Sequence, residues 1–141
     1  MDHGFFRQPD GTVKIFDVLN ATGTVAAAIN ARGQIAGWWE DSINHSHGFV
    51  RNVDGHITVI DVPSAMDTEI MGIDSAGRVV GEYQYADYVS HAFVSEPDGK
   101  ITLIDIPGST YTTVIGMNPG GDIVGVYLDS DRDFHGWVRS H

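Results

Sequence analysis

Cysteine is absent from this chain of 141 residues, and basic side chains are scarce. Without cysteine, disulfides and thiolate metal sites are excluded. Only eight lysines and arginines stand against 19 acidic residues, which gives a formal net charge of −11. Because such a field repels phosphate groups, we expect neither a nucleic-acid partner nor binding to anionic membranes.

Long hydrophobic runs are missing too. No apolar stretch approaches the ~18 residues of a membrane-spanning helix, so we expect no membrane insertion. The chain opens directly into a repeat at His3, and we expect no signal peptide in it. Helical periodicity is scarce, whereas 17 glycines and many β-branched residues are present. This composition is typical of an all-β protein.

A tetrapeptide of the form His-Gly/Ala-aromatic-apolar occurs four times, at a constant spacing of 44 residues. Its histidines are His3, His47, His91 and His135. A fixed period of this length is typical of repeat architectures. We therefore treat residues 1–141 as one repeat domain, with repeats at 3–46, 47–90 and 91–134 and a partial repeat at 135–141.

Each period contains signals for four short antiparallel strands. An Asp-Gly turn precedes one strand, a strand of small residues follows, an Asx-Gly turn leads into a third, and the histidine opens the fourth. Four strands in this length match a β-propeller blade, and a β-trefoil is the alternative. The small residues of 26–28 suit the innermost strand of a blade, where space is limited, and favour the propeller.

With the small-residue strand innermost, complete blades are expected at 24–62 and 68–106. The chain then begins with the last two strands of one blade and ends with the first three of another. We expect two chains to join head to tail about a two-fold axis as a six-bladed homodimer, with strand 13–18 completing the blade that begins at Thr112.

The pattern His-Gly/Ala-Phe, Asp-Gly, Ile-Asp-Val/Ile-Pro, then Ile-Asn/Asp-x-x-Gly resembles the HAF repeat of bacterial extracellular proteins and covers essentially the whole chain. The first repeat departs from it, with Leu19 where the next two have proline. The resemblance implies a propeller-like array and an extracellular or periplasmic location. It supplies no catalytic residues.

The four repeat histidines are expected to be structural. On the blade register they open the third strand from the axis, roughly 10 Å outside the innermost one, and histidines of neighbouring blades diverge. His45 is different because it is unique to one loop and lies two residues from His47. In an extended strand both imidazoles would share a face, so they form a candidate metal site with Glu40 and Asp41, for zinc or calcium.

Glu69 replaces the valine and threonine of the other repeats at the start of an innermost strand, beside Asp67. These carboxylates could bind Ca²⁺, or one with a raised pKa could act as a general base, so they are the candidate catalytic residues. Strand-end carboxylates pointing into water are the alternative.

Aromatic residues that break the repeat are candidates for stacking against a sugar or another small ligand: Trp38, Tyr85, Tyr88 and Tyr111. From these features we expect a binding or scaffold module with a candidate divalent-cation site. The alternative is a metal-dependent hydrolase acting on esters or phosphoesters, like phosphotriesterase or lactonase propellers, whose metal-bound water attacks the substrate.

Overall fold

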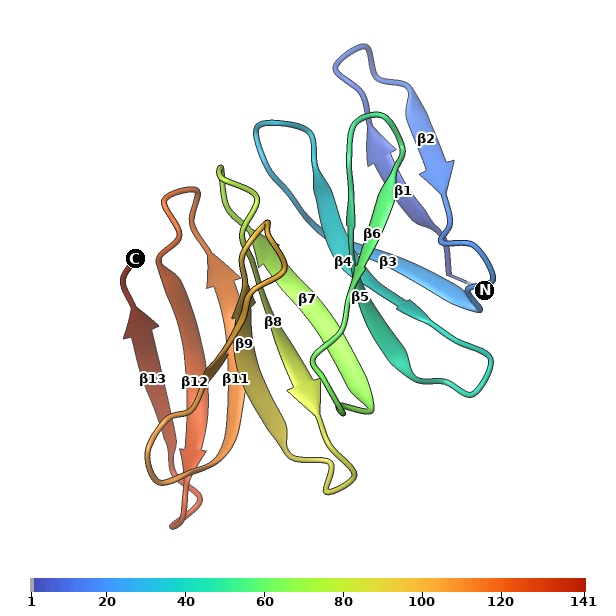
Figure 1. Cartoon of the computed structure of the whole chain (residues 1–141). Helices are drawn as coiled ribbons and strands as arrows, with labels where there is room; N and C mark the ends of the chain where they lie inside the picture. The colour runs from blue at the N-terminus through green and yellow to red at the C-terminus, as the bar shows by residue number, and fades with distance from the viewer. Residues whose placement is uncertain (1) are drawn as a thin grey trace.

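The computed structural model describes residues 2–141, and every regular element in this range is a β-strand. The thirteen strands form four separate antiparallel sheets that follow one another in chain order (Figure 1). The prediction of an all-β fold is confirmed. Over the same range there is no helix long and apolar enough to cross a membrane.

The two central sheets have four strands each. The second sheet contains β3 (Gly23–Ile29), β4 (Ile35–Glu40), β5 (Ser46–Arg51) and β6 (Ile57–Ile60). The third sheet contains β7 (Asp67–Ile73), β8 (Val79–Gln84), β9 (Ser90–Ser95) and β10 (Ile101–Ile104). Their limits agree to within a few residues with the blades expected at 24–62 and 68–106.

The two outer sheets have fewer strands. The first sheet pairs β1 (Gly4–Arg7) with β2 (Val13–Phe16). The fourth contains β11 (Ser109–Met117), β12 (Ile123–Asp129) and β13 (Phe134–Arg139). By the 44-residue period, β1 and β2 correspond to the third and fourth strands of a central sheet, and β11 to β13 correspond to its first three.

Neighbouring sheets pack face to face through three apolar clusters, one at each junction. We call the face turned toward the next sheet along the chain the forward face, and the opposite one the rear face. The forward face of the second sheet presents Ala36 and Val50 to Val79 and Phe93 on the rear face of the third. Phe93 is fully buried there, so these junctions are the core of the protein.

A glycine in the second strand of each larger sheet permits the close approach of its neighbour. A Cβ on Gly81 would collide with the carbonyl oxygen of Glu69 and lie 2.8 Å from the Phe93 ring. The strand register shifts beside this contact, between Ile70 and Gly72. Glycine is therefore required at this position, where the bulged strand β7 lies close to its partner β8. The same backbone collision occurs at Gly37 and Gly125.

Buried threonines tie β2 and β6 to the sheets that follow them. Thr68 is 2% exposed, and its hydroxyl accepts a hydrogen bond from the backbone N–H of Val62, 3.1 Å away. Thr24 makes the equivalent contact with Val18. These bonds satisfy backbone groups just after β2 and β6 and fix where the chain passes from one sheet to the next.

Candidate functional site

Three of the four repeat histidines stack on an aromatic residue of the neighbouring strand. His47 stacks on Trp39 with ring centroids 4.6 Å apart, and His91 stacks on Tyr83 at 5.2 Å. His135 stacks on Tyr127 in the same way. Each histidine faces its aromatic partner across the sheet register, so the pairing follows directly from the 44-residue period.

Three of the four repeat histidines, His3, His47 and His91, face an aspartate 14 residues later. The Nδ1 atom of His3 lies 3.0 Å from Asp17, that of His47 lies 3.1 Å from Asp61, and that of His91 lies 3.9 Å from Asp105. His135 instead places Nε2 2.8 Å from Asp129. Such contacts to strand and loop carboxylates are those expected of structural histidines. The constant 14-residue spacing could have shown the aspartate partners from sequence, but we did not predict them.

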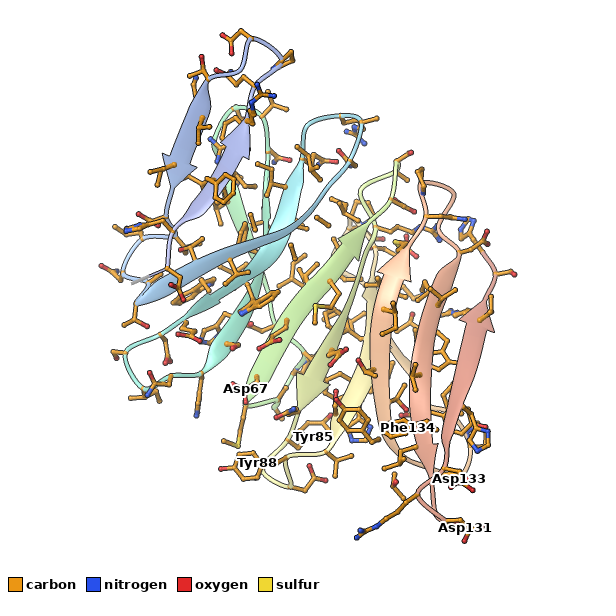
Figure 2. All side chains as sticks on the ribbon, turned by 180° about the vertical axis from the view of Figure 1, so that it is seen from behind. Asp67, Tyr85, Tyr88, Asp131, Asp133 and Phe134 are labelled. Atoms are coloured by element: carbon orange, nitrogen blue, oxygen red, sulfur yellow. The ribbon has the colours of Figure 1, made fainter. Side chains whose placement is uncertain are left out.

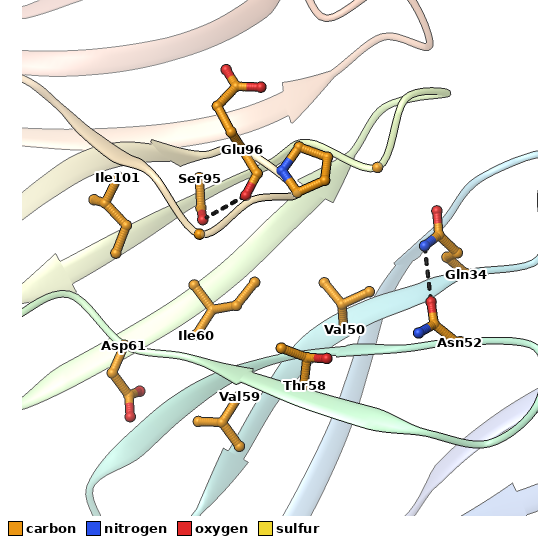
Figure 3. Close-up of a pocket in the computed structure, with 13 residues that line it drawn as sticks. Gln34, Val50, Asn52, Thr58, Val59, Ile60, Asp61, Ser95, Glu96 and Ile101 are labelled. Atoms are coloured by element: carbon orange, nitrogen blue, oxygen red, sulfur yellow. Dashed lines mark hydrogen bonds between the residues drawn. The ribbon is translucent and has the colours of Figure 1, made fainter.

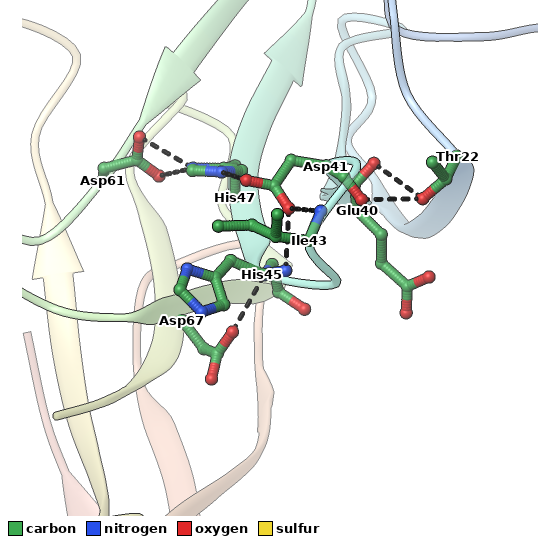
Figure 4. A network of polar contacts seen from close by, with 9 residues as sticks. Thr22, Glu40, Asp41, Ile43, His45, His47, Asp61 and Asp67 are labelled. Carbon is green, nitrogen blue, oxygen red and sulfur yellow. Dashed lines mark hydrogen bonds and ion pairs between the residues drawn. The ribbon is translucent and has the colours of Figure 1, made fainter. Parts of the chain in front are cut away.

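The candidate metal group around His47 is a network of polar contacts (Figure 4). Both ring nitrogens of His47 face carboxylates, with Asp61 3.1 Å from Nδ1 and Asp41 3.5 Å from Nε2. Asp41 in turn accepts the backbone N–H groups of Ile43 and His45, and the His45 contact is the main cause that lowers the pKa of Asp41.

The four proposed ligands are not arranged around a common point. The His45 ring lies on the side of Asp67, away from the Asp41–His47–Asp61 row (Figure 4). Glu40 is exposed at the end of β4. Across residues 2–141, no three histidine, aspartate or glutamate side chains lie close enough together to hold a metal ion. The ion site therefore stays a prediction that needs these side chains to move.

Asp67 and Glu69 line a cavity of about 200 Å³ between the second and third sheets, together with Ser46 and Glu82. Asp67 accepts the backbone N–H of Ser46 at 2.9 Å. Glu69 lies directly opposite Glu82 in the register of β7 and β8. Burial, followed by the nearby charges of Glu82, Asp67 and Glu40, raises the pKa of Glu69, although a hydrogen bond from Ser46 opposes the shift.

Glu82 connects the third sheet to the fourth. Its Oε1 accepts hydrogen bonds from the Thr113 hydroxyl and from the Val114 N–H at 2.8 Å, and its Oε2 accepts one from the Ser90 hydroxyl at 3.0 Å. These three donors fix the position of the Glu82 carboxylate at the junction between the third and fourth sheets. Sequence reasoning missed Glu82, because nothing in the local pattern shows that its side chain reaches the next sheet.

The candidate stacking aromatics do not form one surface. Tyr85 packs edge-on against Tyr83, 5.3 Å away, and against the core of the junction between the second and third sheets. Tyr88 is 71% exposed and lies near Tyr85 at the same end of the molecule as Asp67 (Figure 2). Trp38 and Tyr111 are half-buried on β4 and β11, and no ring contact joins either of them to Tyr85 within the described part of the chain.

A second cavity of about 310 Å³ lies between the outer strands of the second and third sheets (Figure 3). Its walls mix apolar side chains such as Val50 and Ile60 with polar ones. Gln34 donates to Asn52 at 2.9 Å along one wall. Aromatic side chains are missing from the residues that line it, so it lacks the flat surface that favours sugar stacking.

A scan of protein-family models and a search of curated protein sequences find no match to this chain.

Proposed function

We propose that the four sheets are blades of a β-propeller array, with about three blades per chain and six in a ring of two chains. Separate sheets that pack face to face through apolar junctions support this arrangement over a β-trefoil. The resemblance to HAF repeats agrees with it, and with a location outside the cytoplasm. In this proposal the protein is a binding or scaffold module.

The acidic cavity around Glu69 is the proposed binding place, and its ligand is a divalent cation, with calcium preferred. The observation that supports it most is the position of Glu69 opposite Glu82, with Asp67 on the same cavity. Like charges directly opposite in a sheet are destabilising, and a cation between them offsets this repulsion. Among the described residues no three carboxylates converge on one point, so in this proposal water molecules complete the coordination of the ion.

Calcium titration by calorimetry tests this proposal. Protonation of Glu69 competes with the cation, so the affinity should fall when the pH is lowered from 7 to about 5. Glu69→Gln should weaken binding at least tenfold, whereas Glu96→Gln, which changes a carboxylate outside this cavity, should not. Equal affinity for both variants, or absence of heat with the unmodified protein, would reject the acidic cavity as the site.

A metal-dependent hydrolase is the second candidate, and one observation favours it. A carboxylate whose pKa is raised by burial is suited to act as a general base, and Glu69 is such a group. In this alternative Glu69 activates the water and Asp67 helps to hold the ion. Turnover of chromogenic esters or phosphoesters that stops with a chelator and with Glu69→Gln would support it. Turnover unaffected by either change would reject it.

A further inference from the structure

The forward face of the fourth sheet is an exposed apolar surface. Its side chains correspond by the 44-residue period to residues that are packed at the other junctions. Val138 is 72% exposed, while its counterparts Val50 and Val94 are 8% and 5% exposed. Val124 is 45% exposed, while its counterparts Ala36 and Val80 are fully buried. A surface of this kind marks an interaction site.

The fourth sheet is also more apolar than the repeat requires. Val126 stands where the third sheet has Glu82, and Phe134 stands where it has Ser90. Glu82 and Ser90 form the polar bridge to Thr113 and Val114 on the following sheet. The fourth sheet has lost this bridge, and Phe134 is 71% exposed. Its natural partner therefore has apolar residues in the facing positions.

The second sheet has no polar side chain in those positions. At the internal junctions, a polar residue on the first strand of a sheet contacts a polar residue of the preceding sheet. Asp67 accepts the backbone N–H of Ser46, and the Thr113 hydroxyl donates to Glu82. The corresponding residues of β3 are Gly23, in the slot of Asp67, and Val25, in the slot of Thr113 and Glu69. Both surfaces thus lack the polar side chains that the internal junctions have at these positions. The forward face of the fourth sheet and the rear face of the second sheet are therefore complementary to each other.

The rear face of the second sheet also has room for another sheet. The first sheet covers it with only β1 and β2, and a cavity of about 300 Å³ remains beside β1, lined by Phe6, Ile35 and the alanines of 26–28. At the other junctions this region is covered by the preceding sheet's first two strands, which place Met71 and Val80 there. In the fourth sheet these slots hold Ile115 and Val124, which are 68% and 45% exposed.

We propose that the forward face of the fourth sheet docks on the rear face of the second sheet of a second copy, and that β13 takes the place of that copy's β1 beside β2. This inference rests on the proposed propeller arrangement and specifies its closure. Two such contacts, related by a two-fold axis, close a ring of two chains.

Both β13 and the other copy's β1 could occupy the place beside β2. We expect β13 to occupy it, because β13 makes more pairing and packing contacts within its own sheet than β1 does. β13 pairs with β12 at six positions, whereas β1 pairs with β2 at four. Trp137 of β13 is 8% exposed in the core of its junction, but Phe5, in the same slot of β1, is 63% exposed. After the exchange Val138 replaces Phe6 against Phe16, and His135 replaces His3 beside Asp17.

Paired cysteine variants test the exchange in a chain that has no cysteine of its own. Arg7 is opposite Val13 in the present register, so Arg139 of β13 would be opposite Val13 of the other copy. Val13→Cys with Arg139→Cys should therefore form a disulfide-linked dimer on mild oxidation. Phe6→Cys with Val124→Cys should not, because these residues become neighbours only if β1 stays and β13 leaves.

The results separate the alternatives. Cross-linking of the second pair but not the first overturns the exchange of β1 for β13. A ladder of longer cross-linked oligomers overturns closure by two copies, and no cross-link from either pair overturns the docking surface. Calcium titration of the reduced variants does not depend on the cross-linking result. The proposed cation site can therefore be rejected or supported separately from the proposed docking surface.

A point variant supplies the second readout. Val138→Asp should raise the dimer dissociation constant at least tenfold while the circular dichroism of the monomer is unchanged, because Val138 is exposed there. Val53→Asp, at a position that is 69% exposed in the turn between β5 and β6, is the matched control and should leave dimerisation unchanged. Equal dissociation constants for the two variants would contradict the proposal.

Discussion

The imidazole of His47 is stacked on the indole of Trp39, with ring centroids 4.6 Å apart and 26° between the planes. The same ring lies between two carboxylates, Asp61 and Asp41. A single side chain thus joins the second and third strands of its sheet, the loop before β5 and the end of β6. The repeated histidine is best explained as the connection among these segments.

His47→Ala should lower the free energy of unfolding by about 1 kcal/mol, mainly through loss of the aromatic stack. His91→Ala should cost less, because Asp105 lies 3.9 Å from His91 and only one carboxylate faces that ring. Urea denaturation of both variants measures the difference. A larger loss for His91→Ala would contradict this role, and a loss of bound metal in His47→Ala would instead support the candidate metal site.

Gly81→Ala should destabilise the protein by about 3 kcal/mol or more, because the added methyl group meets the Glu69 carbonyl and the Phe93 ring. Gly116→Ala is the matched control in the neighbouring sheet. A Cβ at Gly116 has no heavy atom within 4 Å, and the loss should be within about 0.5 kcal/mol. Thermal unfolding of the two variants provides the comparison, and similar melting temperatures would refute the close strand crossing at Gly81.

The buried ion pair of Asp74 and Arg78 predicts a strongly non-additive double variant. Arg78 Nε donates to Asp74 at 2.7 Å, and the aspartate is 2% exposed. Arg78→Gln alone leaves this carboxylate buried without its charge partner and should cost about 3 kcal/mol.

The double change Asp74→Asn with Arg78→Gln should recover most of that loss. It recreates the neutral pair of the first repeat, in which Asn30 donates to Gln34 at 2.9 Å. Chemical denaturation of the two single variants and the double variant gives the coupling energy. Additive losses would show that the two side chains do not act as a pair.

Glu69→Gln should stabilise the metal-free protein near neutral pH. Burial raises the pKa of Glu69, so the folded state holds its proton over a pH range in which the unfolded state has released it. Stability due to this group is therefore greatest at low pH and is lost as the pH rises through the folded-state pKa. The gain from glutamine should shrink as the pH falls toward 4, and a gain independent of pH would contradict the assignment.

The strand order was predictable because the repeat supplies its own alignment. The small residues around Ala26–Ala28 and the Asx-Gly turns placed the small-residue strands within one residue of β3 and β7, and within three residues of β11. Side-chain contacts between different sheets were harder to predict from the sequence. Neither the bridge from Glu82 to Thr113 nor the direction of the His45 ring follows from strand periodicity, since both depend on how adjacent sheets are turned toward each other.

The prediction that Trp38, Tyr85 and Tyr111 form one ligand-stacking surface shows the same limit of sequence-based reasoning. All three depart from the repeat, but departure alone does not bring residues together. Tyr85 packs against Tyr83 in a junction, while the other two lie on β4 and β11. By contrast, Val126 and Phe134 are departures that share one face of one sheet, and this shared position makes them informative.

The mass of the unmodified protein in solution tests the central claim most directly. Light scattering at micromolar concentration should give twice the 15.3 kDa of one chain, because we propose that a second copy covers the apolar forward face of the fourth sheet. A mass of 15.3 kDa across that concentration range would contradict the account and leave Val138 and Phe134 to a different partner.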